Sequence, residues 1–128
     1  LSVVLSQRLA PRLCQRCKEP RGVSSAEREL YHRFGMDAPS TLHRKRGCPE
    51  CGTGVRGRVP VLELLVMTPA LRDILASDTG FSTKAFRRQW MSEGGRPMGR
   101  FALELAAAGL IEFEEAKRHA IWVPEPPQ

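Results

Sequence analysis

The chain has 128 residues and a net charge of +6, with 41% hydrophobic and 27% charged residues, which is an ordinary globular composition. No apolar run approaches the roughly 20 residues of a membrane-spanning helix, so no transmembrane segment is expected. Residues 1–58 carry twelve Lys and Arg against five Asp and Glu, whereas residues 59–128 carry eight against nine. The basic half indicates either a solvated surface or one that attracts nucleic acid, acidic lipid or an acidic protein.

Leucines recur at four-residue steps near the start of the chain. Leu5, Leu9 and Leu13 would form one apolar stripe on a helix, although Pro11 weakens the pattern. The spacing therefore predicts a helix over residues 1–13. These residues lack a basic leader and a small-residue cleavage site, so no signal peptide is expected.

Two Cys-x-x-Cys pairs carry the strongest chemical signal. Cys14 and Cys17 form the first pair, Cys48 and Cys51 form the second, and thirty residues separate them. A two-residue gap lets both sulfurs of a pair point inward from one tight turn, and two such turns supply four thiolates in a tetrahedron. Because four sulfurs leave no open position, the sequence predicts one structural zinc ion.

The residues around the two pairs support a metal site. Gly52, Gly54 and Gly57 would let the backbone curl around the sulfurs and aim N–H groups at them. Four basic side chains near the pairs would favour thiolate over thiol. They are Arg16, Lys18, Arg46 and Arg56.

Other interpretations of the cysteines stay open. Disulfides persist where proteins are exported, which nothing here indicates, and a redox pair would need a βαβ pattern. Spacing alone does not exclude an iron–sulfur cluster. His43 lies five residues before Cys48 and is expected in a strand or loop rather than as a ligand. His32 and His119 fall in helical patterns and are expected on the surface.

The chain between and after the cysteines reads as helices with one strand. Ser24 and Glu27 form a capping box for a helix over Ala26–Phe34, which Gly35 closes. Val59–Val66 is rich in β-branched residues and leucine, and is predicted to be an edge strand.

Four more helices follow from apolar spacing and terminal signals. The first starts at Pro69, with Thr68 as its cap, and would bury Leu71, Ile74 and Leu75. The others are expected from Phe81-Ser82 to Gly94-Gly95, from Met98 to Gly109, and over Phe113–Ala120.

The predicted fold class is α+β, mainly α, in which a small tetracysteine zinc module precedes a short strand and a C-terminal helical subdomain. Four units are expected. They are a terminal helix over residues 1–13, the zinc module over 14–58, the strand and helical subdomain over 59–120, and a disordered tail over 121–128.

The ordered motifs resemble the C-terminal region of the ATPases that serve type II secretion and type IV pilus assembly. The segment from Leu5 to Cys17 resembles the one that joins their ATPase core to their metal module. Gly47–Gly54 and the later Glu63-Leu64-Leu65 match the second cysteine pair and the strand after it. Gly95–Met98 and Gly109–Arg118 look like the family's C-terminal helical stretch.

The chain departs from the family pattern in places. Val59-Pro60-Val61-Leu62 stands where the family usually has Thr, Gly, an apolar residue and an aromatic one, and Ile111-Glu112 replaces a polar Thr pair. No G-x-x-x-x-G-K-[ST] phosphate loop occurs in residues 1–128, so the family's nucleotide site would lie before Leu1.

The resemblance implies a homohexameric ATPase that drives pilin or pseudopilin assembly from the cytoplasmic face of the inner membrane, to which it is peripheral through its partners. ATP and magnesium would bind in a RecA-like domain, of which residues 1–13 would be the terminal helix. This chain is expected not to be an enzyme by itself, and no catalytic residue is predicted.

The zinc module is expected to dock on, or relay motion to, an inner-membrane platform or assembly protein. The run Arg44-Lys45-Arg46, just before the second cysteine pair, is the predicted partner-binding site. The alternative function is a basic zinc-binding module that binds nucleic acid. Only Tyr31 and Phe34 are aromatic in the basic half, so base-stacking platforms are scarce and nucleic acid is the less favoured partner.

Overall fold

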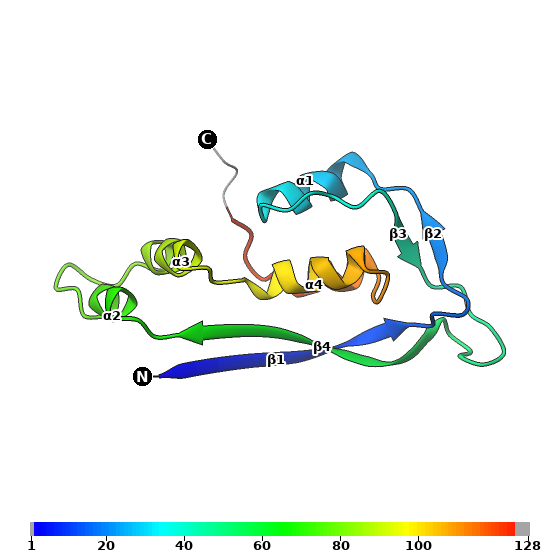
Figure 1. The fold of residues 1–128 in the computed structure, drawn as a ribbon, viewed down its shortest axis with the longest axis horizontal. Coiled ribbons are helices and arrows are strands. Elements are labelled where there is room, and N and C mark those ends of the chain that lie inside the picture. Colours follow the sequence, from blue (N-terminus) through cyan, green and yellow to red (C-terminus); the bar gives the residue numbers. More distant parts are fainter. Residues whose placement is uncertain (1, 125–128) are drawn as a thin grey trace.

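The protein is described by a computed structural model that places residues 2–124. It is a mixed α+β fold, as predicted, and Figure 1 shows its elements. In chain order they are β1 (Val3–Leu13), β2 (Glu19–Arg21), α1 (Ser25–Arg33), β3 (Leu42–Arg44), β4 (Val55–Val66), α2 (Pro69–Leu75), α3 (Thr83–Ser92), α4 (Met98–Ala107) and α5 (Phe113–Arg118). None of the helices in this part of the chain has the length and apolarity of a membrane span.

A long two-stranded antiparallel ribbon runs along one side of the molecule (Figure 1). β1 pairs with β4 from Val3 opposite Val66 to Leu13 opposite Val55, with an irregular register between Pro11 and Leu13. The strand predicted from residue 59 to 66 is confirmed as part of β4, which begins four residues earlier. A second, much shorter antiparallel pair joins β2 to β3.

The helix predicted for residues 1–13 is wrong, because the described residues form strand β1. Leu5 and Leu9 are 60% and 47% exposed, so their four-residue spacing marks no buried helical stripe. Val3 and Val4 are β-branched, and Pro11 cannot donate a helical hydrogen bond. Pairing with the distant β4 then decides the conformation, which local spacing does not reveal.

The helix starts follow the predicted capping signals. At α1, the Ser24 hydroxyl accepts a hydrogen bond from the Glu27 amide at 3.2 Å, and the Ser24 amide donates to the Glu27 carboxylate at 2.9 Å. Thr68 caps α2, which has Pro69 in its first turn, and Ser82 caps α3. The last predicted helix extends only to Arg118, and residues 125–128 of the predicted tail lie outside the described part.

Two burial predictions fail. Leu75 was expected to face the core but is 46% exposed, because the short α2 packs against α3 and buries only Leu71 completely. His119 was expected on the surface but is only 6% exposed. It follows α5, and its Nε2 lies 3.3 Å from a carboxylate oxygen of Glu115, one helical turn earlier. His32 is exposed as predicted.

The hydrophobic core forms around α4, which lies between α1 and the ribbon (Figure 1). The buried Tyr31 hydroxyl of α1 donates to the Leu103 carbonyl of α4 at 2.8 Å and ties the two helices together. The residues of this core come from three of the four units predicted from the sequence. The boundaries of those units stay a prediction. The core residues are Ala10, Tyr31, Phe34, Leu42, Val61, Met98, Ala102, Leu103, Ala106, Ile111, Phe113 and Ala116.

A carboxylate on β4 anchors the start of α4. The Met98 amide at the first turn of α4 donates to a Glu63 carboxylate oxygen at 2.6 Å. The adjacent cap residue, Pro97, makes no side-chain capping bond among the described residues. A negative charge at a helix N-terminus is favourable. The Glu63 carboxylate, although it lies on β4, therefore caps the N-terminus of α4.

An ion pair beside α1 predicts a loss of stability in acid. Arg21 donates to both carboxylate oxygens of Glu27, at 2.9 and 2.7 Å, and the two side chains are 26% and 13% exposed. This bond is the main cause that lowers the pKa of Glu27 to about 2. Because a glutamate in the unfolded chain has a pKa of about 4.3, the stabilisation is complete above that pH and is lost as pH falls towards 2.

Between pH 6 and pH 3, we therefore expect the free energy of unfolding of the unsubstituted protein to fall by about 2 kcal/mol more than that of the Glu27→Gln variant. Urea unfolding at both pH values measures the difference. Glu29→Gln, on the same helix and exposed, is the matched control and should behave like the parent protein. Equal pH dependence in Glu27→Gln and the parent would contradict the prediction.

Candidate metal centre

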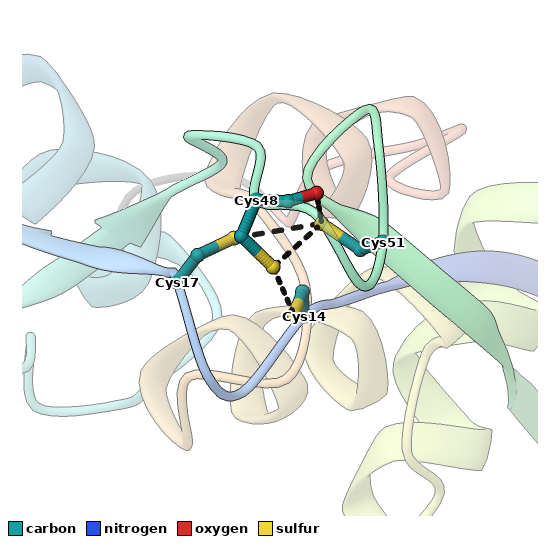
Figure 2. A group of neighbouring side chains, drawn as sticks. All are labelled: Cys14, Cys17, Cys48 and Cys51. Atoms are coloured by element: carbon teal, nitrogen blue, oxygen red, sulfur yellow. Dashed lines mark hydrogen bonds between the residues drawn. The ribbon is translucent and has the colours of Figure 1, made fainter.

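Four cysteine side chains converge where the ribbon ends (Figure 2). Cys14 directly follows β1, and Cys17 lies in the turn before β2. Cys48 and Cys51 lie in the loop between β3 and β4. The two loops face each other, and all four sulfur atoms lie within 4.8 Å of one another.

The spacing of the sulfur atoms fits one tetrahedral metal ion. The Sγ atoms of Cys48 and Cys51 are 3.5 Å apart, those of Cys17 and Cys51 are 3.6 Å apart, and those of Cys14 and Cys48 are 3.9 Å apart. Four sulfurs each about 2.3 Å from a zinc ion would be about 3.8 Å apart. All four cysteines are free, so the cluster can hold one metal ion through four thiolates.

Backbone hydrogen bonds shape both cysteine loops and join them. The Gly52 amide donates to the Cys48 carbonyl at 2.8 Å and closes the second pair into a tight turn. The Gly54 amide donates to the sulfur of Cys51 at 3.3 Å. The Cys14 amide donates to the Gly54 carbonyl at 2.9 Å, which ties the first loop to the second. Gly54 therefore aims its N–H at a sulfur, as the sequence predicted.

Gly54 also has no room for a side chain. Its φ is +97°, in the left-handed region that favours glycine. A Cβ atom at this position would lie 2.5 Å from the Cβ of Lys45 and 3.1 Å from the amide nitrogen of Arg46. The close approach of the Lys45–Arg46 backbone to the loop thus depends on glycine.

Backbone amides favour thiolates at two of the four positions. The amides of Cys51 and then Glu50 lower the pKa of Cys48 to about 7. The amides of Cys17 and Arg16 likewise lower the pKa of Cys14. Burial raises the pKa of Cys17 to about 11, so a metal ion must displace its proton at neutral pH.

The four basic side chains predicted to favour the thiolates are directed elsewhere. Arg16 and Arg56 both pair with the carboxylate of Glu50, and Arg46 pairs with Glu19. The Lys18 ammonium donates to the Gln15 side chain and to the Gly109 carbonyl, at 2.7 and 3.2 Å. The lowered pKa values of the cysteines come from backbone amides instead.

The predicted partner-binding run lies on an exposed stretch beside the metal loops. Arg44 ends β3 and donates to Glu19 at 3.1 Å, and the Arg46 guanidinium lies 3.4 Å from the same carboxylate. The Lys45 side chain is exposed, while its amide donates to Glu112 at 3.0 Å. No sequence pattern predicts Glu19 as a partner, because three-residue strands such as β2 and β3 carry no clear alternation.

The turn between α4 and α5 supports the first cysteine loop, a contact that no sequence pattern predicts. The Leu13 amide donates to the Leu110 carbonyl at 2.8 Å, and the Gln15 side chain donates to the Gly109 carbonyl at 3.1 Å. His43 lies in β3, in a strand as expected, and not within the four-sulfur cluster. The metal loops are thus joined to the helical core by direct bonds.

The amino-acid sequence of this chain is similar to those of known secretion-system proteins. A family model described as "Type II/IV secretion system protein" matches residues 1–118. "Type II secretion system protein E" of Pseudomonas aeruginosa is 44% identical over 79 residues, which are 59% of this chain and 15% of that protein. "Type II secretion system ATPase E" of Vibrio cholerae is 40% identical over 78 residues, which are 60% of this chain and 15% of that protein.

A longer match is to "Type IV pilus assembly ATPase PilB" of Pseudomonas aeruginosa. It is 32% identical over 120 residues, which are 92% of this chain and 21% of that protein. The matched region is therefore about a fifth, or less, of the length of each of these relatives.

Proposed function

Because this chain belongs to the type II/IV secretion system protein family, we propose that it is the zinc-stabilised C-terminal region of an ATPase of type II secretion or type IV pilus assembly. The observation that carries the proposal is a closed four-sulfur cluster within a family match that extends over residues 1–118. Two of the relatives are named as ATPases, whereas residues 1–128 contain no phosphate-loop pattern.

In this proposal, ATP, magnesium and the homohexameric assembly belong to the remaining part of the protein, and this chain does not hydrolyse ATP by itself. Residues 14–58 act as the zinc module and residues 59–120 as the helical subdomain. Strand β1, in place of the helix first predicted, is the element nearest to the RecA-like ATPase domain. The protein works at the cytoplasmic face of the inner membrane, to which its partners hold it.

Zinc gives the chain a rigid surface for docking. A closed four-thiolate shell has no position for a substrate, so the metal serves the fold rather than chemistry. It holds the loop that carries Cys48 and, just before it, the exposed run Arg44-Lys45-Arg46. This run is the proposed contact for an acidic face of an inner-membrane platform or assembly protein, and it keeps its shape only while the metal is bound.

Reversing the charge of this run should weaken partner docking. We expect the triple variant Arg44→Glu, Lys45→Glu, Arg46→Glu to slow association with the cytoplasmic part of the platform protein about tenfold, with a smaller change in dissociation, because exposed charges act mainly through steering. Surface plasmon resonance at several salt concentrations measures both rates, with zinc-free protein as a second negative sample. The matched control reverses three exposed charges on other elements, which are Arg72, Arg88 and Lys117.

Equal loss in the control, or docking that does not change without zinc, would contradict the proposal. The nucleic-acid alternative predicts instead that affinity for DNA or RNA falls steeply with salt, with a log–log slope of roughly five or more. Outside the proposed contact, Arg16 and Arg56 near the cysteines are already paired with Glu50. Submicromolar, sequence-selective binding to DNA or RNA at physiological salt would favour that alternative.

A further inference from the structure

An open cleft lies between the ribbon and the C-terminal helices, away from the cysteines. Its volume is about 590 Å³, which is in the range of small-molecule sites in proteins. It is lined by β1, β4, α3, the start of α4 and the segment that follows α5. Figure 1 shows α3 and α4 on the same side of the ribbon. No cysteine and no residue of the run Arg44-Lys45-Arg46 lines the cleft, so it is separate from the metal centre and from the proposed docking contact.

Strand pairing directs one set of ribbon side chains towards this cleft. Ser6 pairs with Glu63, and Arg8 lies on the same face of β1 because alternate residues of a strand share a face. Nearer the cysteines this face is covered, since Ala10 and Val61 are completely buried in the core around α4. Towards the start of β1 the cover ends, Ser6 and Arg8 are exposed, and the cleft opens.

Aromatic side chains form another part of the wall. Phe86 and Trp90 come from α3, and Trp122 comes from the segment after α5. Trp90 is only 7% exposed, and a Cβ atom on Gly95 would collide with its ring, so this ring is held in place. Large flat side chains bind planar ligands through ring contacts, so the wall suits a ligand with a flat ring.

Two arginines of the cleft have no acidic partner within residues 2–124. Arg8 forms no hydrogen bond or ion pair with them, and the Arg87 guanidinium lies over the Trp122 ring, 4.6 Å from its centroid. The carboxylate of Glu63 also lines the cleft, but it accepts from the Met98 amide instead. An anion in the cleft would therefore meet two guanidinium groups that no carboxylate of the described chain neutralises, and guanidinium groups match phosphate and carboxylate.

The wall of the cleft also holds a polar atom without a partner. His119 lines the cleft, is 6% exposed, and has its Nε2 atom 3.3 Å from Glu115. Its Nδ1 atom is buried and has no hydrogen-bond partner among the described residues. Buried polar atoms are normally satisfied by protein, water or a ligand, so the described part of the chain does not complete this wall by itself.

We propose that the cleft binds a small molecule that combines a flat heteroaromatic ring with one phosphate or carboxylate group. The ring packs on the aromatic wall, and the anion is held by Arg8 of β1 and Arg87 of α3. The size of the cleft suits a molecule of this kind, whereas a folded partner needs a broader surface. This binding goes beyond the function proposed above, because it uses neither the metal centre nor the docking run.

The two tryptophans of the chain give a direct test. Trp90 and Trp122 both line the cleft, so their two indole N–H signals in a proton–nitrogen NMR spectrum of the zinc-loaded chain report on it. The probes are AMP, which carries a phosphate, and nicotinate, which carries a carboxylate. We expect at least one probe to shift both signals and to bind at least about tenfold more tightly than molecules with only the ring or only the anion, which are adenosine, pyridine and inorganic phosphate.

Charge-removing variants test the two guanidinium groups. Arg8→Gln and Arg87→Gln should each weaken binding of the probe by about tenfold, because each removes one charge-assisted contact. Arg88→Gln is the matched control, since Arg88 is exposed on the same helix but does not line the cleft, and it should change binding by less than about twofold. Equal melting temperatures and equal zinc content show that the variants are folded alike.

Indole signals that stay unchanged with both probes up to about 1 mM would overturn the proposal. Affinity for inorganic phosphate, adenosine or pyridine equal to that for the whole probe would also overturn it, as would an equal loss in Arg88→Gln. Tighter binding of AMP would assign the anion to a phosphate, and tighter binding of nicotinate would assign it to a carboxylate. Zinc content and platform binding report separately on the function proposed above.

Discussion

Cys48→Ser should abolish zinc retention and unfold the loops around the metal centre. Structural zinc contributes an apparent binding free energy of about 10–16 kcal/mol at neutral pH in small metal-dependent folds, and one thiolate is a quarter of this closed shell. The amides of Cys51 and Glu50 lower the pKa of Cys48 to about 7, so the native site is built for a thiolate at this position. Cys14→Ser should be equally damaging, because Cys14 is buried and joined to Gly54.

Elemental analysis of protein purified without added metal measures zinc retention. We expect one zinc per chain in the unsubstituted protein and none in either variant. Hydrogen exchange measures the folding of the metal loops, with protection lost over residues 14–21 and 45–57 and retained in α4, whose core is built from apolar contacts. Thr53→Ser, at an exposed position of the same loop, is the control and should keep its zinc.

Zinc binding should also release protons and strengthen as pH rises. Burial raises the pKa of Cys17 to about 11, so this sulfur is protonated at neutral pH in the metal-free chain and loses its proton when zinc binds. Calorimetry in two buffers with different ionisation enthalpies counts the protons. Iron with inorganic sulfide, full zinc retention in Cys48→Ser, or two disulfides by mass would each contradict a four-cysteine zinc site.

Phe34→Ala should lower the free energy of unfolding by about 3–5 kcal/mol, the usual cost of removing a buried phenylalanine. Phe34 lies just after α1, is 1% exposed and belongs to the core around α4. The fit is close, because a Cβ atom on Gly99 of α4 would lie 2.8 Å from the Phe34 ring. Loss of the ring therefore leaves a cavity between the end of α1 and the start of α4.

Urea unfolding of the zinc-loaded protein measures this loss. His32→Ala, at an exposed position of α1 two residues earlier, is the matched control and should change stability by no more than about 0.5 kcal/mol. A loss below about 1 kcal/mol in Phe34→Ala would show that α1 does not share a core with α4. Both proteins should keep one zinc, since the metal loops do not contain Phe34.

The sequence by itself determined the features that depend on neighbouring residues. The two cysteine pairs predicted a four-sulfur cluster, because each Cys-x-x-Cys turn brings its two sulfurs together locally. Ser24, Thr68 and Ser82 marked three helix starts, because a capping bond reaches only two or three residues ahead. The order of motifs was specific enough to indicate the family over nearly the whole chain.

The tertiary structure alone decided the features that depend on distant partners. β1 reads as a helix from its leucine spacing, yet it is a strand because β4 pairs with it across the intervening cysteine loops. His119 is buried and Leu75 is exposed because neighbouring elements, and not the periodicity of their own helices, determine which positions face solvent. Arg44 and Arg46 meet Glu19 only once β2 and β3 pair. Local capping and turn bonds can be read within a few residues, whereas strand pairing and burial are set by contacts between segments far apart in the chain.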